Sequence, residues 1–347
     1  MAGENNYSPY VIIGRLTRDF ILTAEGKDIN DIPGGHLLYT AIGMSPFERQ
    51  PGLIARVGKN FPETNISLLK KYGLSTHGIK RVGFDLEQRN FISFFEDSGH
   101  KAGGFRDQRS TLSMYYKAGK PFPKELLGYN SGKNRTDSLT ERTNDTILAR
   151  DIPPEYLEAR CVHLCPLDYL SHNLLPQAFH GFDRRTITIH ASGGYMQPYF
   201  FDAVKTLVNG LTAFIVRERH VRNLFFEKYR ITQLEDMMKI LLDYGAENIV
   251  IKMEDRSYLF INRADRAVKR LPVPADSPFE KIGELSCFCG AYLVQLNETY
   301  DYIKALCFGA ARATMLQNDT NPYNNLNILD SLLLEKARVM ENKIELG

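Results

Sequence analysis

Short apolar runs alternate along this chain with longer stretches in which hydrophobic residues recur at helical spacing. Such alternation indicates a parallel sheet whose two faces are covered by helices. The apolar runs that predict strands are 10–14, 52–58, 159–164, 186–190, 212–216, 248–252 and 257–261. The stretches that predict helices are 36–44, 62–72, 198–208, 233–244 and most of 291–341. We therefore expect an α/β protein.

The pattern changes between about Ile79 and Tyr116, where polar spacers interrupt the hydrophobic residues. The runs 91–95 and 110–116 are typical of strands and predict a small β-structure that projects from the main domain. Residues 129–146 are polar with few apolar positions, which predicts a mobile loop. A strand-like segment, 269–273, leads through Gly283 toward a helix.

The chain has 347 residues, which suffices for one large core with a small appendage. Its net charge is +2 and its basic residues are scattered, so we expect no nucleic-acid partner. No apolar run is long enough for a membrane span, and the N-terminus lacks the pattern of a signal peptide. These observations favour a cytoplasmic protein without a membrane partner.

Five cysteines, an odd number, all lie in apolar runs. This usage predicts buried free thiols in a reducing compartment. Cys161, His163 and Cys165 share one face of a predicted strand, so a metal site is the lesser alternative. No second ligand pair follows at zinc-site spacing, and we therefore expect no metal.

Four stretches, taken in their order, resemble motifs of the ribokinase-like, or pfkB, family of carbohydrate and nucleoside kinases. They are 14–19 (Gly-Arg-Leu-Thr-Arg-Asp), Pro33-Gly-Gly35, 52–58 with 73–76, and the region from Gly283 to Leu293 followed by 305–311. The resemblance extends from about Val11 to about Gln317. It implies one domain, 1–347, folded as a three-layer α/β/α sandwich with a mainly parallel central sheet. A small β lid would come from about 12–40 and 79–117.

By this resemblance, Asp19 would bind sugar hydroxyls, and Gly34 and Gly35 would let a substrate approach the backbone. Tyr39 stands where the family often has Asn, and an aromatic side chain there would change what can stack or hydrogen-bond. Simpler interpretations remain open for these positions. The glycine pair could be only a turn, and Asp19 could be a surface or capping carboxylate.

The family's catalytic Asp falls on Ser286, and its anion hole falls on Gly283-Glu284-Leu285. A hydroxyl is not basic near neutral pH, and loss of a general base typically costs about 10²–10⁴-fold in rate. Ser286 is instead expected to cap the helix. A carboxylate at Glu284 would compete with phosphate for the positive helix end, or be a helix-terminal charge without a ligand role.

The nucleotide side departs from the family pattern as well. The motif linked to Mg²⁺ and phosphate falls near Arg217-Glu-Arg-His220, where its Asn and Glu are missing. A glycine-containing turn is replaced by 254–257, so Glu254 and Ser257 stand where glycines are expected. His36 is expected to be an ordinary helix-start residue, although it could reach a ligand. The histidines at 163, 172, 180 and 190 are too dispersed along the sequence to predict a site.

Three hypotheses follow. The first is a pseudokinase that retains a sugar- or nucleoside-like pocket near Asp19, Gly34, Gly35 and Tyr39 and needs no cofactor. The second is a divergent active carbohydrate kinase that uses ATP and Mg²⁺, with Glu284 or Glu280 reaching the substrate. The third is a structural subunit. A homodimer through the lid, as in relatives, is a further expectation.

Overall fold

The structure of the chain is a computed structural model. It describes residues 8–346 except 46, 48–49, 96–102, 106–107, 132–136, 180–184, 229, 275–280 and 318–320, and only the backbone of 103–105. Three expectations therefore fall wholly or partly outside the described residues. They concern Glu280 as an acid, His180, and residues 132–136 of the predicted mobile loop.

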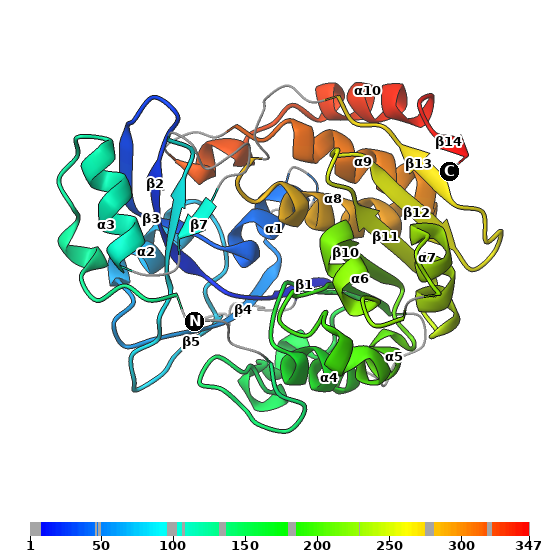
Figure 1. Ribbon diagram of the computed structural model, residues 1–347, viewed down its shortest axis with the longest axis horizontal. Coiled ribbons are helices and arrows are strands. Elements are labelled where there is room, and N and C mark those ends of the chain that lie inside the picture. Colours follow the sequence, from blue (N-terminus) through cyan, green and yellow to red (C-terminus); the bar gives the residue numbers. More distant parts are fainter. Residues whose placement is uncertain are drawn as a thin grey trace, which may run out of the picture.

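In the part of the chain that the structure describes, ten strands form the central sheet (Figure 1). Their order is β14-β13-β12-β11-β10-β9-β8-β1-β4-β5. The neighbours from β11 to β5 all pair in parallel, whereas β12, β13 and β14 add an antiparallel edge. The bounds are β1 (Tyr10–Ile13), β4 (Gly52–Val57), β5 (Gly78–Arg81), β8 (Cys161–Leu164), β9 (Thr186–His190), β10 (Ala213–Arg217), β11 (Asn248–Lys252), β12 (Tyr258–Asn262), β13 (Lys269–Leu271) and β14 (Glu345–Leu346).

Helices cover both faces of this sheet, which makes the three-layer sandwich expected from the sequence. One layer contains α1 (His36–Met44), α2 (Glu63–Lys71), α8 (Glu284–Thr299), α9 (Tyr302–Thr314) and α10 (Asp330–Glu341). The other contains α4 (Tyr169–Ala178), α5 (Phe201–Val208), α6 (Glu218–Leu224) and α7 (Leu234–Asp243). Short 3-10 helices are η1 (Lys124–Leu126), η2 (Ala149–Asp151), η3 (Pro154–Tyr156), η4 (Pro198–Phe200) and η5 (Pro322–Leu326).

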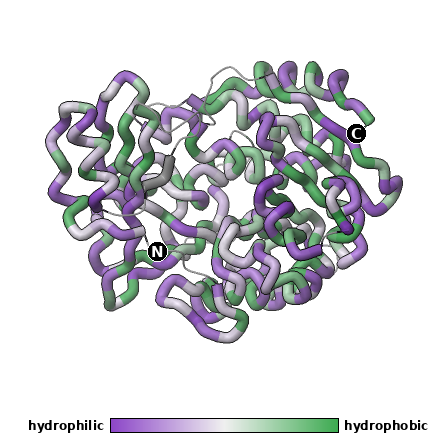
Figure 2. Tube along the Cα trace, in the orientation of Figure 1, coloured by the Kyte–Doolittle hydropathy of each residue, from purple (hydrophilic) through white to green (hydrophobic). Residues whose placement is uncertain are grey.

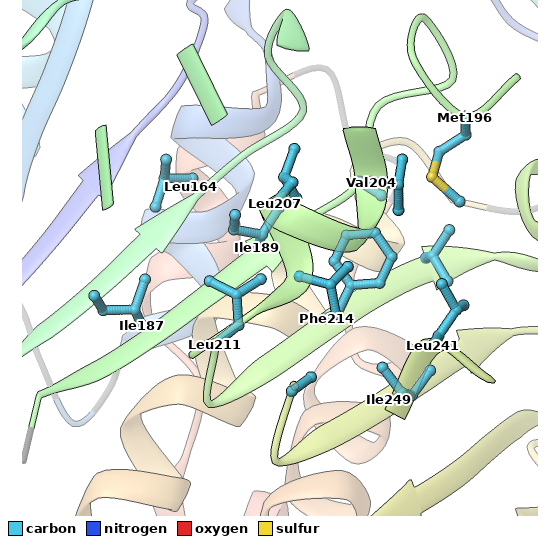
Figure 3. Packing of buried hydrophobic residues seen from close by; sticks show 14 of the residues in the cluster. Leu164, Ile187, Ile189, Met196, Val204, Leu207, Leu211, Phe214, Leu241 and Ile249 are labelled. Atoms are coloured by element: carbon cyan, nitrogen blue, oxygen red, sulfur yellow. The ribbon is translucent and has the colours of Figure 1, made fainter. Parts of the chain in front are cut away.

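Alternating strand residues supply the two cores. Val11 and Ile13 of β1 pack toward α4–α7, whereas Ile12 packs toward α1 and α8. Figure 3 shows the first of these cores, in which Ile189 and Phe214 of neighbouring strands lie near Leu207 of α5. Figure 2 shows hydrophobic stretches along the central strands and hydrophilic ones in many peripheral loops. The apolar runs thus form the interior that their pattern predicted.

A second sheet of four strands forms the small lid, in the order β3-β2-β6-β7. Its bounds are β2 (Thr17–Leu22), β3 (Asp28–Gly34), β6 (Arg89–Ser93) and β7 (Gly103–Phe105). These strands lie within the two segments expected for the lid. The ends of those segments, β1 and β5, belong to the central sheet instead.

The expectation of a strand over 110–116 is wrong. Residues Gln108–Lys117 form helix α3, which packs on one face of the lid sheet. Its buried residues are Thr111, Met114 and Tyr115, a spacing of three and four that marks one helix face. The Thr and Tyr residues suggested a strand, but burial of this face against Phe20 and Phe91 decides the outcome.

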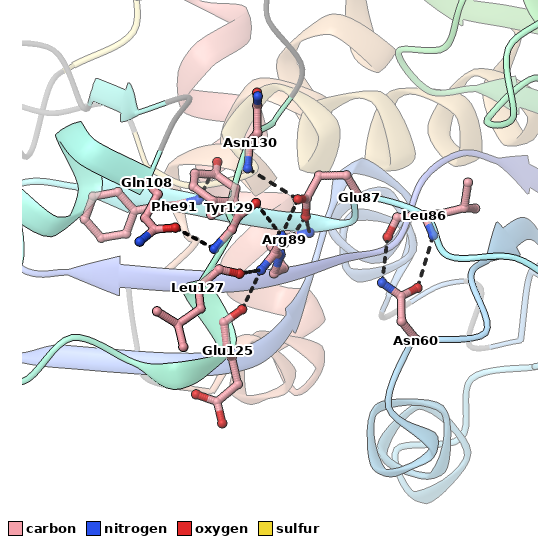
Figure 4. A network of polar contacts seen from close by, with 11 residues as sticks. Asn60, Leu86, Glu87, Arg89, Phe91, Gln108, Glu125, Leu127, Tyr129 and Asn130 are labelled. Carbon is pink, nitrogen blue, oxygen red and sulfur yellow. Dashed lines mark hydrogen bonds and ion pairs between the residues drawn. The ribbon is translucent and has the colours of Figure 1, made fainter.

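A polar network ties the lid to the segment that follows α3 (Figure 4). The Arg89 guanidinium donates to the Glu87 carboxylate and to the carbonyl oxygens of Glu125 and Leu127. The Tyr129 hydroxyl accepts from the Phe91 amide at 3.3 Å. Together these hydrogen bonds hold β6 in place. Other residues of β6 line the cavity that is described below.

All five cysteines are buried and free, as predicted. Among the described residues, no helix is both long and apolar enough to cross a membrane.

Candidate functional site

The lid and the carboxyl ends of the parallel strands enclose a cavity of about 720 Å³. Gly14 follows β1, Pro166 follows β8, and His190, Arg217 and Lys252 end β9, β10 and β11. Ligands of open α/β sheets bind at this edge of the sheet, where the loops after several strands converge. The cavity is therefore the candidate site.

Asp19 is a buried carboxylate at the lid end of the cavity, with 1% of its surface exposed. Its Oδ1 accepts from the Thr17 hydroxyl at 2.6 Å and from the Asn90 amide at 3.2 Å. Burial raises the pKa of Asp19 to about 6, although both hydrogen bonds act to lower it. A carboxylate held by neutral donors in a cavity is suited to accept hydrogen bonds from ligand hydroxyls.

The glycine pair beside Asp19 allows two close approaches. A Cβ on Gly34 would lie 1.9 Å from the Asp19 Oδ2 atom, so this residue backs the carboxylate rather than lining the cavity. Gly35 lines the cavity and has φ 98°, and a Cβ there would lie 2.5 Å from the Arg15 carbonyl oxygen. Both positions therefore require glycine because a Cβ would clash there, and not only because the chain turns.

The start of α8 carries its own anion. The Glu284 Oε1 atom is 2.9 Å from the Lys252 ammonium, and its Oε2 accepts from the Lys281 amide at 3.2 Å. The side chains of Lys252 and Glu284 are 2% and 5% exposed. The Lys252 ammonium also donates to the Arg256 carbonyl and lies 4.2 Å from the centre of the Tyr258 ring. Glu284 thus lies in the first turn of α8, and a buried ion pair holds its carboxylate there.

Ser286 does not cap α8, contrary to the sequence-based expectation. The residue that precedes the helix is Gly283, with φ 74°, and no side chain caps this end. Ser286 is the third residue of the helix, and its hydroxyl is 2.7 Å from His36 Nδ1. Leu285 is a buried residue of the helix.

The hydrogen bond between Ser286 and His36 joins the starts of α8 and α1. Ser286 is 1% exposed, whereas His36 lines the cavity. The His36 ring also meets the His190 ring edge-on, with 5.6 Å between the ring centres. His36 is therefore the member of the pair that a ligand in the cavity would contact.

Tyr39 lies between the lid end and the start of α8. A Cβ on Gly283 would come within 2.0 Å of the Tyr39 ring, so the ring lies directly on this glycine. Burial raises the pKa of Tyr39 well above its usual range, and the charge of nearby Asp19 raises it further. The Tyr39 side chain is a neutral wall of the cavity.

The residues expected on the nucleotide side are only partly brought to the cavity. Arg217 and Glu254 line it, and the Glu254 amide donates to Glu218 Oε2 at 3.1 Å. Ser257 does not line it, because its hydroxyl donates to Asp255 Oδ1 at 2.5 Å. The residue between them, Arg256, lines the cavity with φ 71°, a conformation that favours glycine.

The fold brings close together some of the histidines that are dispersed along the sequence. His163 in β8 and His190 at the end of β9 lie on neighbouring strands. His36 is close enough to lower the pKa of both histidines. Burial, followed by nearby His172 and His36, lowers the pKa of His163 to about 3. The search of the described residues shows no group of three side chains placed to hold a metal ion. These imidazoles are neutral and mostly structural.

Sequence reasoning missed Lys252 and the contact between His36 and Ser286. A lysine at the end of a wholly apolar strand run, 248–252, was an available signal, because a buried lysine needs an anion. Ser286, the hydrogen-bond partner of His36, lies 250 positions away in the sequence, and no local pattern could reveal it.

No protein-family profile matches the chain, and no curated protein matches its sequence. Solved structures do match. A candidate ribokinase II from E. coli, in complex with ATP and Mg²⁺, is 14% identical over 96% of this chain and 99% of that one, with a TM-score of 0.67. Phosphofructokinase-2 from Escherichia coli is 13% identical over 95% and 98%, with a TM-score of 0.60. A nucleoside kinase from Burkholderia thailandensis, in complex with inosine, is 11% identical over 95% and 98%, with a TM-score of 0.62.

At such low identity these likenesses define the fold. The chain has an α/β fold with a large, mainly parallel sheet and a small β lid. More particularly, it is the ribokinase-like, or pfkB, fold that the four sequence stretches implied.

Proposed function

We propose that this chain binds a small hydroxyl-rich ligand, of sugar or nucleoside type, and does not phosphorylate it. The observation that carries the proposal is the buried pair of Lys252 and Glu284 at the start of α8. A transferring phosphoryl group needs the open positive end of such a helix. Here the Glu284 carboxylate lies in the first turn of that helix, where its negative charge would oppose a phosphoryl group.

The lack of a carboxylate base at position 286 supports the same conclusion. Ser286 is buried and bonded to His36, so its hydroxyl is neither basic nor presented to the cavity. The ligand-binding end is better preserved, since Asp19 and Gly35 both line the cavity. We therefore expect binding without phosphotransfer, because the Asp19 end of the cavity matches the family pattern and the α8 end departs from it.

The cavity fits a magnesium–nucleotide complex poorly. Magnesium prefers carboxylates and other oxygen ligands, and the described residues offer no group of three metal-binding side chains. Arg217 and Arg219 instead place positive charge beside the cavity. We therefore propose no cofactor, and ATP with Mg²⁺ would be needed only by an active enzyme.

A divergent active carbohydrate kinase is the second candidate, and His36 is the observation that favours it. The imidazole lines the cavity and is oriented by Ser286. A histidine can accept a proton near neutral pH, as a general base for a ligand hydroxyl must. In this alternative His36 takes the place of the missing carboxylate.

The two candidates differ in calorimetric titration and a phosphotransfer assay. We expect ATP with Mg²⁺ to give no binding heat, and a panel of sugars and nucleosides to yield no phosphorylated product. One panel member should bind, and Asp19→Asn should weaken that binding at least tenfold, because a charged hydrogen-bond acceptor is lost. The exposed pair of His77 with Glu155 provides a control position, His77→Gln.

Phosphorylated product would contradict the proposal. If His36→Gln abolished that product while His77→Gln did not, the active-kinase alternative would replace it. Glu284→Gln and Glu280→Gln would then test the two carboxylates named from the sequence. We also propose a cytoplasmic location, which the five free cysteines support.

A further inference from the structure

We propose that residues 137–145 form a strap that opens while the rest of the chain stays folded, and that its opening admits the ligand to the cavity. The strap belongs to the polar segment for which the sequence predicted a mobile loop. This inference rests on the proposed function and adds a route of ligand entry to it. Its test needs no ligand, so the two statements can fail separately.

The strap forms part of one wall of the cavity. Its last residue, Asp145, lines the cavity, and the Asp145 Oδ2 atom is 3.1 Å from Arg15 Nη2. Arg15 follows β1 and lines the cavity as well. The carbonyl oxygen of the next residue, Thr146, accepts from Nη1 of Arg56 in β4 at 2.7 Å. Displacing the strap would therefore uncover the cavity beside the ends of β1 and β4.

Buried contacts fix the chain directly after the strap. The Ile147 amide donates to Ser171 Oγ at 2.9 Å, and the Ser171 hydroxyl donates to Asp168 Oδ2 at 2.6 Å. The Thr146 hydroxyl donates to the other carboxylate oxygen of Asp168 at 3.3 Å. Thr146 and Ile147 are each 1% exposed. We therefore expect these two residues to stay in place as the hinge.

Within the strap, few contacts reach the core. Leu139 is a partly buried apolar side chain that packs against the core. The amides of Thr140 and Glu141 both donate to Ser138 Oγ, so these hydrogen bonds lie inside the strap. Residues 140–144 are exposed. A segment with few buried apolar contacts opens locally at a small cost in free energy.

Polar contacts hold the strap closed at each end. At one end is the ion pair of Arg15 with Asp145, whose side chains are 44% and 13% exposed. At the other end the Asp137 Oδ2 atom accepts from the Tyr169 amide, at the start of α4, at 3.0 Å. A Cβ on Gly194 would lie 2.7 Å from the Asp137 carboxylate, so this side chain rests directly on the loop after β9. Because these contacts are polar, they can break while the core stays packed.

The charges around Asp137 make its contact sensitive to pH. Burial and the nearby Asp168 carboxylate raise the pKa of Asp137 to about 6, whereas the Tyr169 amide acts to lower it. The charge of Arg15 lowers this pKa too, and burial keeps the Tyr195 hydroxyl beside it neutral. An open strap would have the ordinary pKa of 3.8, so the closed strap binds the proton more tightly. Closure is therefore favoured in acid and loses this advantage as pH rises through 6.

Limited digestion of the whole chain with trypsin measures strap opening. Arg142 is exposed in the middle of the strap, and a protease cuts a segment that has come away from the folded core. We expect cleavage after Arg142 while the chain stays folded, identified by the mass of a peptide that begins at Thr143. The initial rate, corrected for trypsin activity on a peptide substrate, should be about fourfold higher at pH 8 than at pH 5.5, because Asp137 has then lost its proton.

Substitutions at the two ends should change this rate in opposite directions. Asp137→Asn keeps an oxygen acceptor for the Tyr169 amide but carries no charge. Cleavage at pH 8 should therefore fall at least about fourfold and lose its pH dependence. Asp145→Asn removes the ion pair with Arg15, so cleavage should rise about two- to fivefold. Asp243→Asn removes an exposed ion pair of α7 outside the strap and the cavity, and this matched control should leave the rate unchanged.

Diethyl pyrocarbonate tests whether the open strap admits a small molecule. This reagent transfers an ethoxycarbonyl group to an imidazole nitrogen and releases carbon dioxide and ethanol. His36 lines the cavity, whereas His77 is an exposed reference whose side chain is 40% exposed. At pH 8, modification of His36 measured by mass spectrometry should be slower in Asp137→Asn and faster in Asp145→Asn than in the wild type. His77 should react equally in all three.

The proposal is overturned by cleavage after Arg142 that occurs only when urea unfolds the whole chain, by unchanged pH dependence in Asp137→Asn, or by equal rates for Asp145→Asn and Asp243→Asn. Equal modification of His36 in every variant would show that small molecules enter by another route, which removes the role in ligand entry. If Asp137→Asn does not fold, Asp145→Asn decides against its control. Failure of the proposed function is separate, since it would show as phosphotransfer or as absence of ligand binding.

Discussion

Asp19 shows how a binding role conflicts with stability at the scale of one residue. The carboxylate is buried, and among the described residues its hydrogen-bond donors are the neutral groups of Thr17 and Asn90. Desolvation of this charge is therefore only partly offset in the free protein. A ligand hydroxyl would supply the missing hydrogen bond.

Replacing Asp19 with Asn should stabilise the free protein at neutral pH. The folded pKa of Asp19, about 6, exceeds the ordinary 3.8, so the folded state binds the proton more tightly. The wild type thus loses stability as pH rises from about 4 to 6, by on the order of 2–3 kcal/mol, whereas the variant does not. Urea unfolding of both proteins across this range measures the difference.

Comparing the wild type with the Asp19→Asn variant removes the contribution of the histidines to the pH dependence of stability. His163, with a folded pKa of about 3, is neutral when buried and takes up a proton on unfolding below about pH 6.5, so acid destabilises both proteins alike. A difference that does not change with pH, or a less stable variant at pH 8, would show that the Asp19 charge is not the cause.

At this scale the sequence predicted positions better than contacts. Asp19 and Gly283 line the cavity and Glu284 begins α8, whereas the roles that the motifs imply for them stay predictions. The expected cap at Ser286 failed because the positive φ of Gly283 sets where the helix begins. The partner of Ser286 depends on how α1 and α8 pack, which no local pattern encodes.

At the scale of elements, α3 is the main difference from expectation. Strong periodicity identified the strands of the central sheet, whereas residues 110–116 carry few apolar positions and many residues common in strands. The lid core decides the outcome, since Met114 and Tyr115 pack with Phe20 and Phe91. Tertiary contacts therefore override the local preference here.

Two neighbouring positions of α3 test this assignment. Met114 is 6% exposed and Leu112 is 46% exposed. Met114→Ala should destabilise the protein by about 2–5 kcal/mol, because it leaves a cavity in the lid core. Leu112→Ala should change stability by less than about 0.5 kcal/mol. Comparable losses from both, measured by urea unfolding, would contradict a helix with this buried face.

At the scale of the whole molecule, the alternation of runs predicted the sandwich, but not the order of its strands. That order places β8 beside β9 and brings the ends of β1, β8, β9, β10 and β11 to one cavity. Residues that are far apart in the chain meet only after the sheet has formed. For this reason single motifs of the candidate site could be predicted from the sequence, but their arrangement in space could not.

The lid also bears on assembly. One face of its sheet carries Asp19 and Asn90 toward the cavity, and the other is packed against α3 (Figure 1). In the described part of the lid, one face is thus covered by α3 and the other faces the cavity. The family resemblance suggested a homodimer through the lid, and this stays a prediction. Light scattering of the whole chain tests it, since a mass of 39.5 kDa at every concentration would contradict the dimer.

The buried pair of Lys252 and Glu284 has a consequence for evolution. Removing one partner of such a pair costs about 3–5 kcal/mol, because it leaves an isolated charge in the interior, whereas exchanging both together is nearly neutral. A chain that changed one of these two residues at a time would therefore be destabilised before both were replaced. If this chain does not transfer phosphate, as we propose, gaining that activity at the start of α8 would require both residues to change together.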